Sequence, residues 1–363
     1  MEKMFSMKKK GLGIVIATAL VVAALSGCGA KKEVTENVAL LQLAAANDYT
    51  ATTVEKTTQR YASENGLIYK GHPVKSNELE DVEAEVKLAA EAGADVIVCS
   101  GTAFEKSIYQ LQGQYKDVKF IIVDGAPRKE EGKKFKVRKN TEAIMYAEEQ
   151  GGFLAGYAAI KDGYKNLGFI GGVPSENTVR YGTGFVQGAN YAAEEMGLDK
   201  DKIIIRFTYL GTNEMSPALM ELAGQWYDEG SEIIFASGGT IGTAVMKAAE
   251  QKGKKAIGVD CDQSSESDSV VVSVVKQIDS ALYSSLASVY NGEFKGKKAL
   301  EMNVADGGIA LSMEKAKFNT FTQQDYATII NKMSGKDLVI SKEEAQALQA
   351  KKDGFKNITL NIE

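Results

Sequence analysis

The sequence predicts an α/β protein of two lobes, each built on a doubly wound parallel sheet. Short apolar runs alternate with longer segments of helical periodicity, and this alternation is typical of parallel strands covered by helices. The alternation occurs as two similar series, which indicates two similar lobes. The length of 363 residues agrees with this division, because a chain of this size exceeds what one compact core normally holds.

Residues 1–27 have the composition of a secretory signal. Lysines at positions 8–10 precede an apolar stretch at residues 12–25, which is too short for a convincing membrane-spanning helix. Residues 25–28 read Leu-Ser-Gly-Cys and resemble the bacterial lipobox, whose cysteine is acylated and becomes the new N-terminus. We therefore expect Cys28 to be a lipid anchor on the extracytoplasmic face of the cell membrane. The alternative is a cysteine that merely follows a signal peptide or an uncleaved anchor.

The first series of elements lies before residue 163. Gly66 and Gly93 mark the ends of two predicted helices, since a glycine in the left-handed conformation commonly closes a helix. Strands are expected at residues 38–43, 95–99 and 118–123, and helices at residues 53–65, 79–89, 104–115 and 142–160.

The second series repeats this pattern and is followed by a tail. Residues 336–363 are rich in lysine and show little apolar periodicity, so we expect them to pack weakly on the surface. Strands are expected at residues 167–170, 203–209, 232–235, 256–259 and 270–275, and helices at residues 178–196, 216–229, 241–252, 278–291 and 323–333.

Composition excludes several classes of function. The net charge is -5 and the lysines are scattered, which argues against a nucleic-acid partner. The single histidine, His72, lies in a turn-like Gly-His-Pro, so neither a histidine-based metal site nor a catalytic triad is expected. No cofactor and no enzymatic activity are predicted. Cys99 and Cys261 could form a disulfide, but buried free thiols are the preferred interpretation.

Polar residues follow the predicted strands at their carboxyl ends, where open α/β sheets bind ligands. Asp124 and Asp260 are the strongest candidates, because a carboxylate directly after a buried strand is costly unless a polar group meets it. Lys276 could reach the same region as a donor or be an ordinary surface lysine. Gly238 and Gly239 form either a ligand turn or a tight turn before a helix. The polar turns lie at residues 47–48, 100–102, 124–125, 171–172, 237–240 and 260–263.

Several stretches together resemble the basic membrane protein family of lipoproteins, whose members resemble the purine nucleoside receptors of ABC importers. The resemblance implies a type I periplasmic-binding fold whose two lobes are joined by three crossings. We expect residues 37–163 with 277–303 to form the first lobe and residues 164–276 with 304–335 to form the second. A flexible linker is expected before them, at residues 28–36. The resemblance also implies a small-molecule ligand and a permease partner. The matching stretches are residues 94–101, 120–125, 146–159, 168–174, 184–189, 233–240 and 257–263.

The resemblance also assigns residues to the site. Asp124 stands at the family's strand-end aspartate, Asp260 and Lys276 at its ribose-side aspartate and lysine, and Gly238 and Gly239 at its glycine turn. Phe235 corresponds to a stacking aromatic.

The first lobe departs from this pattern, because Leu43 stands where the family has an aspartate and Thr52 lies near the position of a stacking phenylalanine. Asn47, Asp48 and Tyr49 are the candidate substitutes.

The sequence thus predicts a lipid-anchored substrate-binding protein of an ABC importer. Its ligand is expected to be nucleoside-like or another hydroxylated small molecule, bound between the lobes. One alternative is a sensor that presents its ligand to a membrane receptor. The other is an extracytoplasmic enzyme acting on nucleosides, with Asp124 or Asp260 as a general base.

Overall fold

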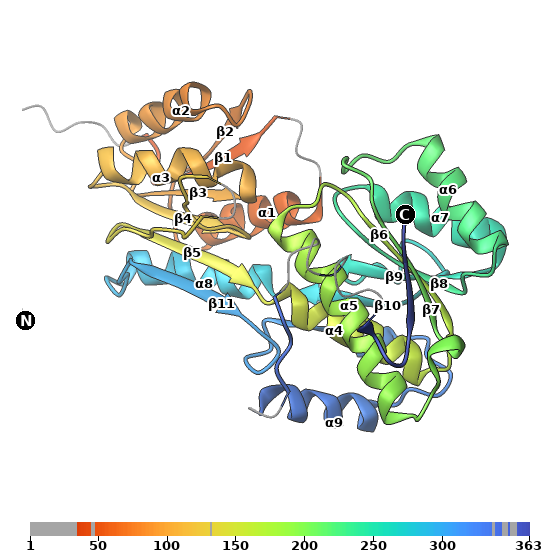
Figure 1. Ribbon diagram of the computed structural model, residues 1–363. Helices are drawn as coiled ribbons and strands as arrows, with labels where there is room; N and C mark the ends of the chain where they lie inside the picture. The colour runs from red at the N-terminus through yellow and green to blue at the C-terminus, as the bar shows by residue number, and fades with distance from the viewer. Residues whose placement is uncertain (1–34, 45–47, 131–132, 336–337, 343–347, 349–353) are drawn as a thin grey trace, which may run out of the picture. The chain divides into compact units, whose positions relative to one another are not determined.

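The computed structural model describes residues 35–44, 48–130, 133–335, 338–342, 348 and 354–363. These residues form two largely parallel sheets, one of six strands and one of seven (Figure 1). In spatial order, the first sheet contains β11 (Lys298–Met302), β5 (Thr141–Tyr146), β4 (Lys119–Val123), β3 (Val96–Ser100), β1 (Val38–Leu43) and β2 (Tyr69–Val74). The second contains β12 (Ile309–Leu311), β10 (Val270–Lys276), β9 (Lys255–Asp260), β8 (Ile233–Ser237), β6 (Asn166–Gly171), β7 (Ile204–Tyr209) and β13 (Thr359–Ile362).

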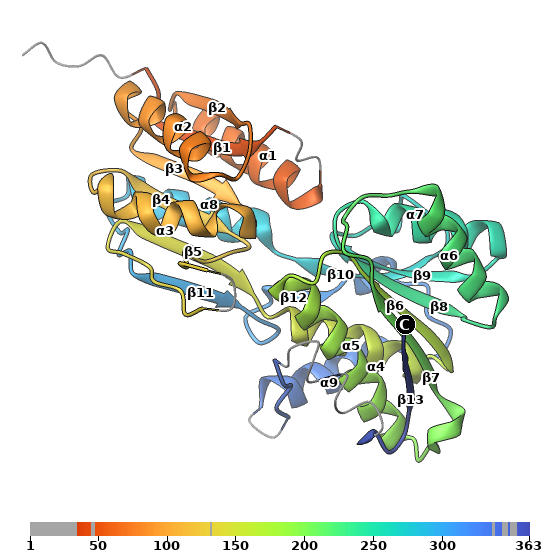
Figure 2. The ribbon, with the colours of Figure 1, turned by 45° about the horizontal axis from the view of Figure 1, so that its top comes forward.

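Helices cover both faces of the first sheet, as Figure 2 shows. On β1, Ala39 and Leu41 face α2 (Leu79–Ala92) and α3 (Glu105–Gln114), and the residues between them face α1 (Tyr49–Glu64) and α8 (Ile278–Tyr290). This alternation follows from the two-residue period of a strand. Because the central strands β3 and β4 are buried on both sides, they appear in the sequence as continuous apolar runs.

The second sheet is covered in the same way. Phe169 of β6 packs with α4 (Glu148–Lys161) and α5 (Glu176–Glu195), and the adjacent Ile170 faces α6 (Pro217–Asp228) and α7 (Ile241–Lys252). The last helix, α9 (Gln323–Ser334), adds Ile329 and Met333 to the core on the α4 side. Both sheets therefore have the doubly wound arrangement that the sequence predicts.

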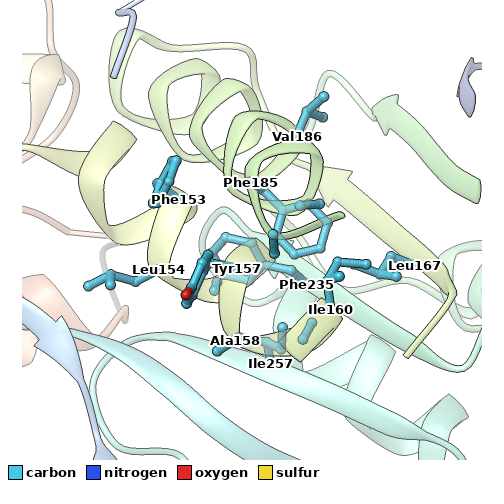
Figure 3. Packing of buried hydrophobic residues seen from close by; sticks show 14 of the residues in the cluster. Phe153, Leu154, Tyr157, Ala158, Ile160, Leu167, Phe185, Val186, Phe235 and Ile257 are labelled. Carbon is cyan, nitrogen blue, oxygen red and sulfur yellow. The ribbon is translucent and has the colours of Figure 1, made fainter. Parts of the chain in front are cut away.

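Helices α4 and α5 approach each other closely enough for their backbones to touch. A Cβ atom on Gly156 would lie 2.1 Å from the carbonyl oxygen of Phe185, and one on Gly188 would lie 2.0 Å from that of Phe153. Gly152 and Gly184 are equally tight. Only glycine permits this distance. Around this contact lie the aromatic side chains of the second core, several of which Figure 3 shows.

Three crossings connect the two sheets. The first leads from β5 into α4 at Ala147, the second from β10 into α8 at Gln277, and the third from β11 to β12 through residues 303–308. Backbone hydrogen bonds tie them together, with the amide of Ala147 donating to Met302 at 2.9 Å and the amide of Gln277 donating to Gly308 at 2.9 Å. The type I periplasmic-binding fold with three crossings is thereby confirmed.

Two local predictions are wrong. The helix expected at residues 142–160 begins only at Glu148, because the preceding residues form β5 between β4 and β11. A strand buried on both faces lacks the alternation that distinguishes it from a helix. His72 lies in β2 rather than in a turn, with Nδ1 2.9 Å from Glu85 and Nε2 3.1 Å from Glu36. Pro73 is tolerated beside it because β2 is an edge strand.

The tail is not a weakly packed surface segment. Its last residues form β13, which pairs in parallel with β7 and buries Leu360. The indole of Trp226 donates to the side chain of Glu363 at 3.1 Å. Apolar residues spaced irregularly along the tail join the second core, so helical periodicity could not reveal them.

Packing also bears on where the lobes divide. Helix α4 contributes Phe153, Leu154 and Ala158 to the core of the second sheet, although its residues were expected in the first lobe. We therefore propose that the second lobe begins at α4 rather than after residue 163. In the same way α8 and β11 lie with the first sheet, and β12 and α9 with the second.

The glycine contact generates a stability prediction. Gly156→Ala should lower the free energy of unfolding by about 3 kcal/mol or more, because the new methyl group overlaps a backbone carbonyl that cannot move away. The matched control is Gly224→Ala in α6, where the nearest atom lies 3.6 Å away. The control should raise stability by about 0.5–1 kcal/mol through helix propensity. Denaturant unfolding measures both, and equal effects would contradict the packing argument.

Candidate ligand site

A cleft of about 550 Å³ lies at the carboxyl ends of strands from both sheets. Its walls come from the segments after β1, β3 and β4 on one side and after β8 and β9 on the other, which is where open α/β sheets bind ligands. The lining includes Asp48, Tyr49, Ser100, Thr102, Asp124, Asn177, Thr178, Tyr181, Asn213, Ser237, Gly238, Gly239, Asp260 and Lys276.

Lys276 occupies the centre of the site at the end of β10. Its Nζ lies 2.7 Å from Asp124 Oδ1, 3.1 Å from Glu148 Oε1 and 3.5 Å from Asp260 Oδ1. The lysine side chain is only 1% exposed. The contact with Asp124 is a hydrogen bond, and the contacts with Glu148 and Asp260 are ion pairs. Lys276 therefore lies among three carboxylates at the cleft wall, and its role as a donor to the ligand stays a prediction.

Asp124 and Asp260 have an unusual backbone. Their φ angles are 61° and 64°, in the left-handed region that side-chain-bearing residues seldom occupy. Such strain costs of order 1 kcal/mol or more per residue and persists only when surrounding contacts enforce it. Asp124 directly follows β4 and Asp260 is the last residue of β9, and both carboxylates lie against the same ammonium group.

Tyrosines surround the lysine on its apolar side. Nζ of Lys276 lies 5.2 Å from the ring centre of Tyr146 and 5.4 Å from that of Tyr181, within the range of cation–π attraction. The hydroxyl of Tyr181 donates to Asp260 Oδ1 at 3.2 Å. Burial raises the pKa of Asp260, an effect that the Lys276 ammonium opposes. The pKa of Lys276 is itself raised well above its ordinary value by Asp124 and the neighbouring carboxylates, against the effect of burial.

Glu148 is a site residue that the sequence interpretation missed. Its side chain is 1% exposed, and its second carboxylate oxygen lies 3.3 Å from Arg180. Burial raises the pKa of Glu148 to about 7, although Lys276 and Arg180 pull it down. The available signal was the Glu148-Glu149 pair within an otherwise apolar, glycine-rich stretch. Its meaning was lost because the predicted helix placed the pair in its middle instead of at its start.

The glycine turn after β8 is shaped by Asn213. Gly238 and Gly239 have φ angles of 138° and 49°, and a Cβ on Gly239 would lie 2.5 Å from the carbonyl oxygen of Asn213. The Asn213 side chain accepts from the amide of Val173 at 2.9 Å. The turn therefore brings backbone from three loops together at the cleft wall, and glycine is required there for packing.

The first-lobe wall is formed by the start of α1. Asp48 accepts from the amide of Ala51 at 2.8 Å and caps this helix. Tyr49 follows it, 42% exposed, and lines the cleft. Asn47, predicted to contribute here, lies outside the described residues, as does Cys28.

Phe235 is wrongly assigned to the site. It is fully buried in the second core, where it lies beside Phe185 (Figure 3). Its ring also contacts those of Phe169 and Tyr181. Its position in β8 points its side chain toward α4 and α5, away from the cleft, and it is absent from the cleft lining. The residue two positions later, Ser237, lines the cleft instead.

A second cavity of about 720 Å³ adjoins the cleft and shares Tyr49, Asp260, Cys261 and Lys276 with it. Among the described residues that line the two cavities, Lys276 is the sole cation. Seven carboxylates accompany it, namely Asp48, Asp124, Asp260, Asp262, Glu266, Asp279 and Glu314. Carboxylates therefore outnumber cations in the lining, and two of them are paired from outside it, Asp279 with Arg60 and Asp262 with Lys315.

A fold of two lobes with carboxylates in the cleft between them belongs to several known groups of proteins, and sequence comparison distinguishes among them. The sequence model of the Bmp family, described as ABC transporter substrate-binding protein PnrA-like, matches residues 36–344. The chain belongs to the Bmp family. This membership confirms the resemblance and makes the protein a substrate-binding protein of the ABC transporter type rather than an enzyme.

Curated Bmp proteins align over much of the chain. Basic membrane protein D of Borreliella burgdorferi is 29% identical over 248 residues, 67% of each chain. The ABC transporter nucleoside-binding protein BmpA of Lactococcus lactis is 23% identical over 342 residues, which cover 85% of this chain and 93% of that protein. A solute-binding protein of an ABC transporter system from Aeropyrum pernix has the same fold, with a TM-score of 0.66 at 17% identity, covering 88% of this chain and 87% of that one.

Other features of this Bmp protein concern thiols, metals and membrane spans. Cys99 and Cys261 are both free, and burial raises the pKa of Cys261 to about 12. Within the described ranges, histidine, cysteine, aspartate and glutamate side chains form no group of three placed to hold a metal ion. No helix in the same part of the chain has the length and apolar character needed to cross a membrane.

The buried Glu148 predicts a pH dependence of stability. Its folded pKa of about 7 exceeds its ordinary value of 4.5, so the folded state holds the proton more tightly. The resulting stabilisation is complete below the unfolded pKa and is lost as the pH rises to about 7. Relative to Glu148→Gln, the wild-type free energy of unfolding should therefore fall between pH 4.5 and 7, by on the order of 3 kcal/mol. Denaturant unfolding at several pH values tests this, and a constant difference would contradict it.

Proposed function

We propose that this protein is the lipid-anchored receptor of an ABC importer and that it binds an uncharged, hydroxylated small ligand of the nucleoside type in the cleft. The observation that carries the proposal is the pair of strand-end carboxylates, Asp124 and Asp260, held by one buried lysine. Oxygen atoms of a carboxylate accept hydrogen bonds from neighbouring hydroxyl groups, such as those of a sugar ring. The name of the Lactococcus lactis relative, a nucleoside-binding protein, points to the same class of ligand.

The charged residues of the cleft lining narrow the class of ligand further. Lys276, the one cation in the described lining of the cleft, already forms ion pairs with three carboxylates, so the lining offers no unpaired cation to meet a phosphate. A phosphorylated ligand would instead approach Asp48, Asp124 and Asp260 and meet like-charge repulsion. We infer that the receptor accepts nucleosides and rejects nucleotides.

The aromatic contact to a base would come from a different position than in related proteins. Tyr49 is the exposed aromatic side chain of the lining, at the start of α1, whereas Phe104 and Tyr181 are each 2% exposed. Stacking of a ring on Tyr49 would contribute about 0.5–1.5 kcal/mol beyond burial. Asp48, and Asn47 beside it, would supply polar contacts to the same group.

A ligand screen tests this function. Isothermal titration of the purified protein with ribonucleosides, the matching 5′-monophosphates, free bases and pentoses should give saturable heat with nucleosides and none with monophosphates. Asp260→Ala should weaken nucleoside binding at least tenfold, because a charged acceptor contributes roughly 1.5–3 kcal/mol. Asp228→Ala, a surface carboxylate paired with Lys252, is the matched control and should bind normally. Binding of the monophosphates with equal affinity would refute the charge argument.

Membrane attachment is part of the same proposal and rests on the Leu-Ser-Gly-Cys sequence at residues 25–28. A receptor tethered through acyl chains stays close to its permease. Cys28→Ala, expressed in a bacterial host, should move the protein from the membrane pellet to the soluble extracytoplasmic fraction. Labelling with a fatty-acid analogue should be lost together with the anchoring. Retention of both membrane association and label in the variant would rule out Cys28 as the anchor.

A further inference from the structure

A second charged cluster adjoins the ligand carboxylates and is centred on Arg180 of α5. The guanidinium group lies 3.3 Å from Glu148, donates from Nε to Glu149 at 2.7 Å, and reaches Glu301 of β11 at 2.9 Å. The arginine side chain is 7% exposed, and both glutamates of α4 are at most 2% exposed. A fully buried charge of this kind is stable only when its partners are in place.

The members of this cluster come from all three crossings. Glu148 and Glu149 open α4 directly after the first crossing, Lys276 ends β10 at the second, and Glu301 lies in β11 just before the third. A continuous row of ion pairs therefore runs from Lys276 through Glu148 and Arg180 to Glu301. Any relative motion of the lobes passes through these segments, because they are the connections between the two sheets.

Glu148 is the link between the two clusters. Oε1 faces Lys276 and Oε2 faces Arg180, so each carboxylate oxygen serves one cation. Without this carboxylate, the lysine ammonium would be shared between Asp124 and Asp260 alone. It would then move toward them and occupy acceptor positions that the ligand needs. The ligand carboxylates are thus available only because a third carboxylate shares the lysine.

We propose that Glu148 and Arg180 are positioning residues that hold Lys276 between the two ligand carboxylates and couple ligand binding to the three crossings. They touch the ligand site only through Lys276. The inference rests on the proposed function in one respect, since it assumes that Asp124 and Asp260 meet the ligand. The inference makes a prediction that the proposed function does not make, namely that residues without contact to the ligand control the affinity of the protein for the ligand.

The test compares Glu148→Gln with Glu195→Gln in the full-chain protein. Gln keeps the size of the side chain and removes its charge. Glu195 is the matched control, because it lies on α5, pairs with Lys161 and Lys332 and accepts from Tyr157, but takes no part in the crossings. Two measurements are made on each variant. One is the ¹⁵N NMR signal of the Lys276 ammonium, assigned by its loss in Lys276→Arg, and the other is nucleoside affinity by calorimetry.

The expected results separate the variants. Wild type and Glu195→Gln should show a slowly exchanging Lys276 ammonium signal and equal nucleoside affinity. Glu148→Gln should shift or lose that signal and weaken nucleoside binding roughly tenfold, the effect of about 1.4 kcal/mol expected for a disturbed charged hydrogen bond. An unchanged signal in Glu148→Gln, or an unchanged affinity, overturns the proposal.

Two further comparisons test the proposal if Glu148→Gln does not fold or if the wild type binds no nucleoside. Glu301 is 39% exposed, so Glu301→Gln perturbs the far end of the row with less risk of unfolding if Glu148→Gln fails to fold. It should produce a smaller shift of the Lys276 signal, and no shift would refute the coupling. If wild type binds no nucleoside, the proposed ligand is wrong, and the Lys276 signal alone then decides whether Glu148 positions the lysine.

Discussion

The placement of one buried ammonium group among three carboxylates is the constraint on which the site depends. Lys276 stands at the end of β10, where the chain leaves one sheet for the other, and it contacts one carboxylate from each sheet and one from a crossing. Removing any of these partners leaves a charge in an environment that solvates it poorly. The strained turns at Asp124 and Asp260 are stable in this context, because the attraction to the ammonium offsets the backbone cost.

Much of this arrangement could be predicted from the sequence, and the exceptions have physical causes. Asp124 and Asp260 were found because carboxylates directly after buried apolar runs are conspicuous. Glu148 was missed because β5 is buried on both faces and has no alternating pattern, so strand and helix could not be distinguished. Phe235 was placed in the site by the family resemblance alone, and the apolar run of its strand does not reveal which face each side chain occupies. Side-chain direction depends on register, which only the folded sheet fixes.

The second sheet has a rigid side, and its origin is steric. Glycines on α4 and α5 allow the two backbones to touch. The aromatic side chains of the same core lie around this contact and fill the space beside β6 to β8. The first crossing enters this packed region directly, so the segment that carries Glu148 is anchored to the second sheet. The cores on the two faces of each sheet are apolar, whereas the crossings are held by backbone hydrogen bonds and by ion pairs. The fold thus combines apolar cores on both faces of each sheet with polar connections between the sheets.

The left-handed backbone at Asp124 and Asp260 also limits how this receptor could be redesigned. A β-branched or bulky residue at either position would raise the conformational energy of the folded protein, with or without ligand. Asparagine and glycine are therefore the replacements with the smallest backbone cost. New specificity is more accessible at the start of α1, where Tyr49 is exposed and has ordinary helical geometry. A mutational library for altered cargo should therefore diversify the first-lobe wall and leave the two strand ends unchanged.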